Sequence, residues 1–319
     1  MIVRWGLGEL EGLLSELGVS RPFLVASPRW DAPVDVIGEW REVPSDRIAD
    51  AVAAATSADG ILAVGGGSAI DLGKAVSAET GLPLVSVPTT YSGAEWTPSF
   101  GIRDPDRRMR GGGSGARLAG IVYEAELTLG LPRAVTVGTA MNALDHAAEA
   151  LYVEGRNEEG DREALAGASL IGEWLPRVVE TPDDLEARRA LLEGAGHAGA
   201  ALASAGLGLA HAMAQALGGR FGLPHGALNA ITLPPALRFN EPVASAEIAR
   251  FGEALGTDDP IGRVQELALL GGYKRLRDLG VPENELTEVA EAAAGRPGAR
   301  ANPRPATPSQ ISDLLRSVY

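Results

Sequence analysis

Cysteine is absent from the 319 residues of this chain. Its absence excludes a disulfide framework, a thiolate nucleophile and any metal site with cysteine ligands. Histidine is also scarce, with only four in the chain, so each one can be considered individually. Aromatic residues contribute 5%, but hydrophobic residues as a whole reach 45% and charged residues 22%, which is ordinary for a soluble globular protein.

Basic residues are too few to balance the acidic ones. Lysine and arginine number 28 against 42 aspartates and glutamates, so the net charge at pH 7 is −14. Nucleic-acid binding needs a basic face that neutralises phosphates, so we expect no nucleic-acid partner. Long apolar runs are missing, and the first residues do not combine a basic start with an apolar core, so we expect no membrane partner. Together with the missing cysteines, these features predict a cytoplasmic protein.

The first part of the chain alternates strand and helix signals. Short runs rich in β-forming residues are separated by helical stretches such as residues 46–58. The runs are residues 23–26, 61–64 and 84–87. This order predicts a doubly wound, mostly parallel sheet with helices on both faces.

The second part of the chain has a different character. From about residue 137 the β signal fades, and alanine-rich amphipathic segments follow one another. A chain of this length can bury a large core and form two domains. We therefore predict an α/β dinucleotide-binding domain over residues 1–133 and an all-helical catalytic domain over residues 134–319, with Pro132 next to the boundary.

A glycine-rich turn follows the apolar run at residues 61–64. It reads Gly65-Gly66-Gly67-Ser68 and leads into a helix that contains Asp71 and Lys74. A strand that ends in glycines and passes into a helix leaves backbone N–H groups unpaired, and these favour a phosphate or pyrophosphate. The pattern differs from the common G-x-G-x-x-G fingerprint because Ile70 stands where the third glycine would be.

Further motifs follow this turn in a fixed order. The order is GGGS-x-x-D-x-x-K, P-T-T, N-x-x-x-H-A-x-E, H-A-M-A-x-x-L-G-G and P-H-G. Over about residues 20–240 it resembles the iron-containing (group III) alcohol dehydrogenase superfamily. Within that superfamily, residues 88–98 and 127–132 are most similar to the maleylacetate reductases. The resemblance implies the dehydroquinate-synthase-like fold: a nicotinamide-binding α/β domain, a helical domain and an active site between them. It also implies a homodimer.

The resemblance assigns candidate cofactor-binding residues. It places the pyrophosphate at Gly66, Gly67 and Ser68, and it places Thr89, Thr90 and Leu129 along the cofactor. Asp71 is a further candidate, although an acid in the first turn of a helix needs no ligand to explain it. Likewise, Thr89 and Thr90 taken alone would be an ordinary strand end.

The residue after the second strand bears on the choice of nucleotide. An acidic side chain there would bind the ribose 2′-hydroxyl and repel a 2′-phosphate. This chain has Ala26-Ser27-Pro28-Arg29 instead, with Ser27 as a candidate contact. Arg29 is either a partner for a 2′-phosphate or a surface arginine. We therefore expect either NAD(H) or NADP(H) to serve as the cofactor.

The resemblance also bears on metal binding. Family members that use iron or zinc hold it with one aspartate and three histidines, and the matching residues here are Asn142, His146, His211 and His225. Spacing of four puts the first two on one helix face. A neutral amide is a poor substitute for the acid, so we favour a metal-free site, with an Fe or Zn site at these four residues as the alternative. Asp145 points about 100° away from His146 and is not expected to replace the acid.

Without a metal, one of the three histidines or a bound water would donate a proton while hydride arrives from the nicotinamide. Gln215 stands where alcohol dehydrogenases often have another histidine, and it can only form hydrogen bonds. His197 matches no ligand position, and we interpret it as a helix-packing residue. The arginine-rich segment 103–117 either binds a substrate carboxylate or forms a solvated hairpin.

These observations favour an NAD(P)H-dependent reductase of a small carbonyl or enone compound that carries a carboxylate. A metal-dependent alcohol dehydrogenase is the alternative within the superfamily. A dehydroquinate-synthase-like lyase is an alternative from another reaction class. A degenerate protein that binds NAD without turnover is the non-enzymatic alternative, suggested by Asn142 and Gln215 together.

Overall fold

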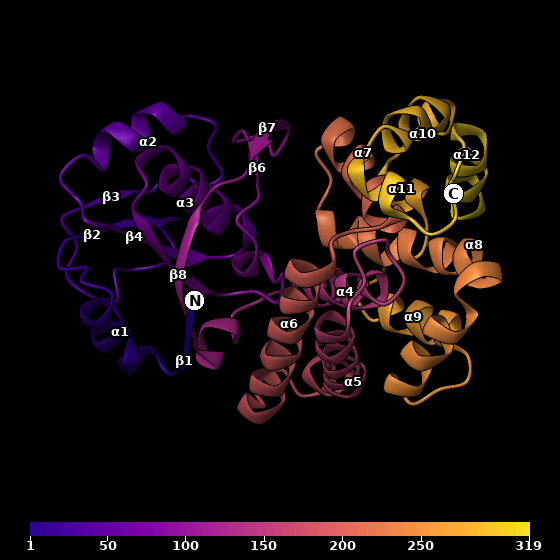
Figure 1. The fold of residues 1–319 in the computed structure, drawn as a ribbon, viewed down its shortest axis with the longest axis horizontal. Helices are drawn as coiled ribbons and strands as arrows, with labels where there is room; N and C mark the ends of the chain where they lie inside the picture. Colours follow the sequence, from indigo (N-terminus) through magenta and orange to yellow (C-terminus); the bar gives the residue numbers. More distant parts are fainter. The chain divides into compact units, whose positions relative to one another are not determined.

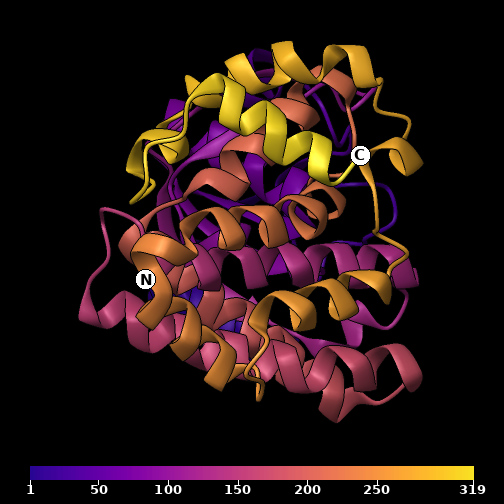
Figure 2. The same cartoon turned by 90° about the vertical axis from the view of Figure 1, so that its right-hand side faces the viewer.

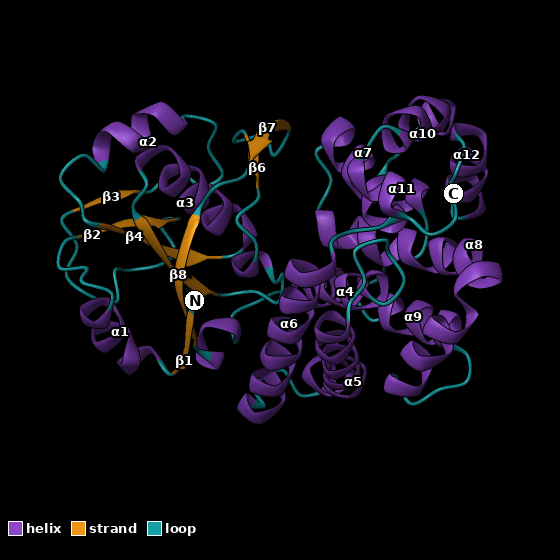
Figure 3. Ribbon diagram, viewed as in Figure 1, coloured by secondary structure: helices purple, strands orange, loops and turns teal.

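The computed structural model describes all 319 residues, which divide into two compact units. The first unit comprises residues 1–90 and 94–129, and the second comprises residues 91–93 and 130–319. Figure 3 shows strands in the first unit and helices throughout the second. The predicted combination of an α/β part with an all-helical part is thereby confirmed.

A six-stranded sheet forms the centre of the first unit (Figure 1). Its strands follow the order β1-β8-β5-β4-β2-β3, and every neighbouring pair is parallel. They are β1 (Ile2–Trp5), β2 (Pro22–Ala26), β3 (Gly38–Trp40), β4 (Gly60–Gly65), β5 (Pro83–Pro88) and β8 (Arg117–Tyr123). A separate antiparallel hairpin consists of β6 (Phe100–Arg103) and β7 (Met109–Gly113).

Both faces of the sheet are covered. The helices of this unit are α1 (Leu10–Glu16), α2 (Ile48–Ala54) and α3 (Gly67–Thr80). Successive residues of a strand point to opposite faces, so Leu62 and Val64 join the core under α1, whereas Ile61 and Ala63 join the core under α2 and α3. Burial on both faces explains why the strands read as unbroken apolar runs.

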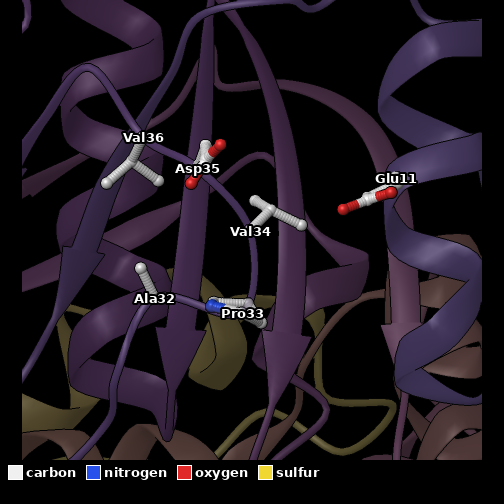
Figure 4. Close-up of a pocket in the computed structure, with 6 residues that line it drawn as sticks. All are labelled: Glu11, Ala32, Pro33, Val34, Asp35 and Val36. Carbon is white, nitrogen blue, oxygen red and sulfur yellow. The ribbon is translucent and has the colours of Figure 1, made fainter.

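The connection from β2 to β3, residues 27–37, contains no helix. Parallel strands usually need a crossover of a dozen or more residues, commonly a helix. Here Trp30, Val34 and Val36 pack against the core on the α1 side in its place. A hollow of about 560 Å³ remains between this segment and Glu11 of α1, as Figure 4 shows.

The second unit is built around α4, in which every residue from Ala140 to Ala150 is buried. This helix packs against α5, α6 and α8, and Figure 2 shows the unit with α12 on the side facing the viewer. The helices are α4 (Arg133–Ala150), α5 (Glu158–Glu180), α6 (Leu185–Ala205), α7 (Leu209–Phe221), α8 (His225–Ala254), α9 (Pro260–Leu269), α10 (Leu286–Ala294), α11 (Pro297–Ala301) and α12 (Pro308–Ser317). Taken singly, none of the helices has the length and apolar character needed to cross a bilayer; α6 and α7 meet that criterion only as a pair, bent by 101°.

Several helices of this unit begin with a side-chain cap. Asn157, Asp184 and Asp259 accept hydrogen bonds from the first turns of α5, α6 and α9. By contrast, α4, α7 and α8 have no cap from their N-cap residues. These three helices carry the candidate catalytic residues, so the N–H groups at their starts depend on other partners.

Residues 91–93 belong to the helical unit although the chain on either side of them belongs to the first unit. The Tyr91 backbone N–H donates to Thr139 Oγ1 of α4 at 3.3 Å, and Arg188 Nη1 of α6 donates to the Tyr91 hydroxyl at 3.2 Å. Gly93 has a φ of +69°, and a Cβ there would lie 3.2 Å from Gly199 Cα of α6. This segment is therefore an integral part of the helical core.

Candidate active site

The glycine turn joins β4 to α3, as predicted. Gly65 has a φ of +148°, and Gly66 is the N-cap of α3 without any side-chain cap. The first turn of α3 contains no acidic residue, and Gly66, Gly67 and Ser68 are partly exposed. The backbone N–H groups and the positive end of the helix dipole are therefore available to an anion such as a pyrophosphate.

The end of β5 lies directly against this turn. The Thr89 backbone N–H donates to the Gly65 carbonyl at 3.0 Å. A Cβ on Gly66 would lie 2.9 Å from Thr90 Cγ2, which is closer than real side-chain contacts allow. The fold therefore brings together Gly66, Gly67, Ser68, Thr89 and Thr90, the main candidates for cofactor binding.

The strand order supports this location independently. From β2 the chain moves outward to β3 and then returns past β2 to β4, so the order reverses between β2 and β4. Ligands of open α/β sheets bind beyond the carboxyl ends of the strands at such a reversal. Ala26 at the end of β2 is paired with Val64 of β4, so Ser27 and the glycine turn leave the sheet side by side.

Replacing Gly66 by alanine tests the glycine turn. The new Cβ would meet Thr90 Cγ2 at 2.9 Å, so either the turn or the Thr90 side chain must shift, and both are candidates for cofactor binding. We expect NADH or NADPH to bind at least about tenfold more weakly, a loss of about 1.4 kcal/mol, as measured by fluorescence titration. Gly111→Ala is the control, because a Cβ at Gly111 has no neighbour within 4 Å; equal affinity in the two variants would contradict the assignment.

Two other cofactor candidates have different surroundings. Asp71 Oδ1 accepts from Lys74 Nζ at 3.1 Å, and its Oδ2 accepts from the Gly101 backbone N–H at 3.2 Å. These contacts join α3 to β6 and account for Asp71 without a ligand. Leu129 is half-buried and follows a short 3-10 turn, Ala125–Thr128, after β8.

The arginine-rich segment is the β6–β7 hairpin. Arg110 Nε donates to Asp104 Oδ2 at 2.7 Å, and Arg103 Nη1 donates to the Arg107 carbonyl at 3.0 Å. Asp104 thus already neutralises one of these guanidinium groups. This pairing favours the solvated hairpin over a carboxylate-binding site.

In the second unit, α4, α7 and α8 bring three of the four histidines together. The ring centroids of His146 and His211 are 4.7 Å apart and nearly parallel, and those of His211 and His225 are 5.5 Å apart. His146 and His211 are buried, with 5% and 1% of their surface exposed, whereas His225 is partly exposed at the start of α8. The fold therefore collects the predicted histidines into one cluster.

Glu149 of α4 organises this cluster. Its Oε2 accepts from the Gly208 backbone N–H at 2.7 Å, and its Oε1 accepts from the Ala210 N–H at 2.7 Å. The same Oε2 is 3.0 Å from His211 Nδ1. One carboxylate thus caps α7 in place of a local side chain and orients His211, the one histidine of α7.

Asp145 is the second carboxylate at this histidine. It points about 100° away from His146 on α4 and was not expected to join the site, but the fold brings His211 to it, with Oδ2 3.0 Å from His211 Nδ1. The pKa of Asp145 is raised to about 7, mainly because the side chain is buried. The nearby His211 lowers this pKa, and the negative charge of Glu149 raises it further. Burial disfavours the charged form of the His211 ring and acts to lower its pKa, whereas Asp145 and Glu149 act in the opposite direction.

Sequence analysis did not identify Asp145, Glu149 or Asn229 as site residues. Asn229 lies on α8, four residues after His225, and its Nδ2 is 3.0 Å from His211 Nε2. The spacing of four places it on the same helix face as His225, a signal that could have found it. Glu149 is the last letter of the N-x-x-x-H-A-x-E motif and could have been found the same way.

The remaining predicted residues have definite partners. Asn142 Nδ2 donates to the Ser92 carbonyl at 2.8 Å and lies 3.4 Å from His146 Nε2. Gln215 Oε1 accepts from Arg296 Nη1 at 3.4 Å, so this side chain is turned toward the start of α11. His197 of α6 pairs with Glu163 of α5 at 2.7 Å, which agrees with a helix-packing residue.

Amide groups engage two of the four expected metal positions, Asn142 and His211. A divalent ion needs lone pairs directed at one point. Asn142 Oδ1 and His211 Nε2 both face the side-chain nitrogen of Asn229, and Asn142 Nδ2 is bound to the Ser92 carbonyl. These amide groups fill the lone pairs that a cation would need, and Asn142 supplies no negative charge.

Comparison with known proteins gives a consistent relationship. Residues 4–119 match the iron-containing alcohol dehydrogenase domain, and residues 136–319 match the C-terminal domain of the Fe-containing alcohol dehydrogenase family. The maleylacetate reductase of Burkholderia cepacia is 35% identical over 336 aligned residues, which cover 99% of this chain and 95% of that protein.

Solved structures agree in fold. The maleylacetate reductase from Agrobacterium tumefaciens superimposes with a TM-score of 0.90 at 30% identity, covering 100% of this chain and 95% of the other. An iron-containing alcohol dehydrogenase from Corynebacterium glutamicum superimposes with a TM-score of 0.91 at 31% identity, covering 100% and 94%. The chain therefore belongs to the iron-containing alcohol dehydrogenase family and is an NAD(P)-dependent oxidoreductase.

Proposed function

We propose that this enzyme reduces maleylacetate, or a small carboxylated enone or keto compound of the same type, with NADH or NADPH. The observation that carries the proposal is the full-length relationship to maleylacetate reductases, at 35% identity over 99% of the chain. In this reaction a hydride passes from the nicotinamide to an electron-poor carbon of the substrate. A proton passes to the oxygen or carbon atom that gains the electron pair, and the nicotinamide is left oxidised.

The first unit would bind the cofactor. The N–H groups of Gly66, Gly67 and Ser68 would hold the pyrophosphate, and Thr89 and Thr90 would lie beside it because they pack against the same turn. Ser27 follows β2 with no acidic residue next to it, so neither a 2′-hydroxyl nor a 2′-phosphate is rejected. We therefore expect both NADH and NADPH to be accepted.

The histidine cluster of the second unit would supply the proton, and His225 is the best candidate for the donor. His225 is partly exposed, so it can meet a substrate and regain its proton from solvent after each turnover. His146 and His211 are buried, and His211 is held between Asp145 and Glu149. These two histidines would shape and polarise the site, with Asn142 fixed beside them.

We propose further that this chemistry needs no metal ion, because the amide groups of Asn142 and Asn229 engage the atoms that would otherwise coordinate one. A metal-dependent alcohol dehydrogenase is the second candidate. Donor atoms of Asp145, Glu149 and His211 lie within 4.8 Å of one another and are buried, which is the one observation that favours it. Against it, both Glu149 oxygens already accept N–H groups of α7.

An assay of the purified protein without a metal-binding tag tests both candidates. NADH and NADPH oxidation would be followed with maleylacetate, before and after treatment with a chelator, alongside elemental analysis. We expect turnover with either nucleotide, less than stoichiometric iron or zinc, and no effect of the chelator. Stoichiometric metal with activity lost on chelation would favour the second candidate. Nucleotide binding without turnover on a panel of carbonyl compounds would contradict both.

A further inference from the structure

The orientation of the Asn142 amide is dictated by a backbone carbonyl. The Ser92 oxygen can only accept a hydrogen bond, and the Asn142 side-chain nitrogen lies 2.8 Å from it. Turning the amide over would place two oxygens in contact. The Asn142 nitrogen therefore faces Ser92, and its oxygen must face the other way.

Asn229 continues this chain of hydrogen bonds. Its side-chain nitrogen donates one hydrogen to Asn142 Oδ1 and directs the other at His211 Nε2, 3.0 Å away. Asn229 cannot turn over either, because its oxygen would then meet the Asn142 oxygen. Asn229 is fully buried, so water offers no alternative partner. His211 Nε2 must therefore be an acceptor, and the proton of the neutral ring lies on Nδ1.

The other side of the ring fits this tautomer. His211 Nδ1 is 3.0 Å from Asp145 Oδ2 and 3.0 Å from Glu149 Oε2, and the Glu149 oxygen is placed to accept its hydrogen. These carboxylates also favour a second proton on the ring, whereas the amide hydrogens of Asn229 oppose one at Nε2. The amide orientation follows from the Ser92 carbonyl oxygen, which can only accept a hydrogen bond, so Nε2 remains the acceptor.

We propose that Asn229 is a positioning residue that, with Asn142, forms an amide relay from the Ser92 carbonyl to His211 and holds His211 Nε2 as a hydrogen-bond acceptor. His211 then neither donates a proton to the substrate from Nε2 nor binds a cation there. The side-chain nitrogen of Asn229 faces the lone pairs of both Asn142 Oδ1 and His211 Nε2, which a metal ion would otherwise need. The consequence for catalysis rests on the proposed function, but the tautomer itself does not.

Nitrogen-15 NMR of the imidazole rings tests the relay directly. The wild-type protein would be labelled at histidine, and the His211 signals would be assigned from their loss in His211→Gln. At neutral pH we expect a protonated Nδ1 and an unprotonated Nε2. In Asn229→Asp a carboxylate oxygen replaces the amide nitrogen, so we expect Nε2 to shift to its protonated position.

Asn240→Asp is the matched control. Asn240 is a fully buried asparagine of the same helix, and its amide pairs with Asn302. This variant should leave the His211 signals unchanged. If Asn229→Asp fails to fold, the wild-type spectrum still decides, because a protonated Nε2 there would overturn the inference. An inactive protein with the expected tautomer would instead contradict only the proposed function.

Discussion

Replacing His225 by glutamine is expected to lower kcat by about 10²- to 10⁴-fold, the usual contribution of a general acid. Glutamine keeps hydrogen-bonding capacity at the start of α8 but cannot transfer a proton. The Kd for NADH should stay within about threefold of the wild-type value, a change of less than ~1 kcal/mol. The reason is that the candidate cofactor-binding residues lie in the first unit, whereas His225 lies in the second. Stopped-flow nucleotide oxidation and fluorescence titration give the two quantities.

A second histidine variant, His197→Gln, shows whether a loss of activity comes from the missing proton donor or from a general disturbance of the helical unit. His197 pairs with Glu163 between α5 and α6, outside the cluster of three rings. His197→Gln should therefore leave kcat close to that of the wild-type enzyme. If both variants lose activity equally, or if His225→Gln keeps full activity, His225 is not the proton donor.

Replacing Glu149 by alanine should cause the largest loss of stability. The change leaves His211 beside a single carboxylate and removes the acceptor from the Gly208 and Ala210 N–H groups at the start of α7. Removing one partner of a buried ion pair typically costs about 3–5 kcal/mol. Urea unfolding should show a decrease of that size in the free energy of unfolding. The free energy of unfolding of Glu149→Gln should lie between those of the wild type and Glu149→Ala, because the glutamine amide keeps one acceptor oxygen.

Glu163→Ala offers the comparison, because it also removes an acid that pairs with a histidine. The Glu163 and His197 side chains are 22% and 35% exposed, whereas those of Glu149 and His211 are 0% and 1% exposed. A partly exposed pair contributes at most about 1 kcal/mol. Similar losses in the two variants would show that the Glu149 carboxylate does not stabilise α7 as the contacts indicate.

The main elements of the fold could be predicted because their signals are local. The apolar run at residues 61–64 and the glycines after it define β4 and the start of α3, since each feature depends on neighbouring residues. The lack of a helix in residues 27–37 was harder to predict from the sequence. There Trp30, Val34 and Val36 cover the sheet in place of a helix, through contacts with strands that are distant in the sequence. The helix expected over residues 46–58 is also shorter, Ile48–Ala54.

In the candidate site too, contacts between residues far apart in the sequence could not be predicted from local patterns. Asn142 and His146 could be paired from their spacing, since both lie on α4. The contact between Glu149 and the start of α7 spans 59 residues of sequence, so no local pattern indicates it. The sequence places Asp145 about 100° around the helix from His146, which is correct for a single helix. Only the packing of α7 against α4 turns that direction into a contact with His211.

The placement of residues 91–93 within the helical unit limits how the two parts of this enzyme can be recombined. A chimaera joined to a relative only near residue 130 would combine one parent's segment 91–93 with the other parent's α4 and α6. Tyr91 with Arg188, Ser92 with Asn142, and Gly93 with Gly199 would then come from different parents. Domain exchange in this family therefore requires three junctions, at residues 90, 93 and 130, so that each of these pairs is inherited together.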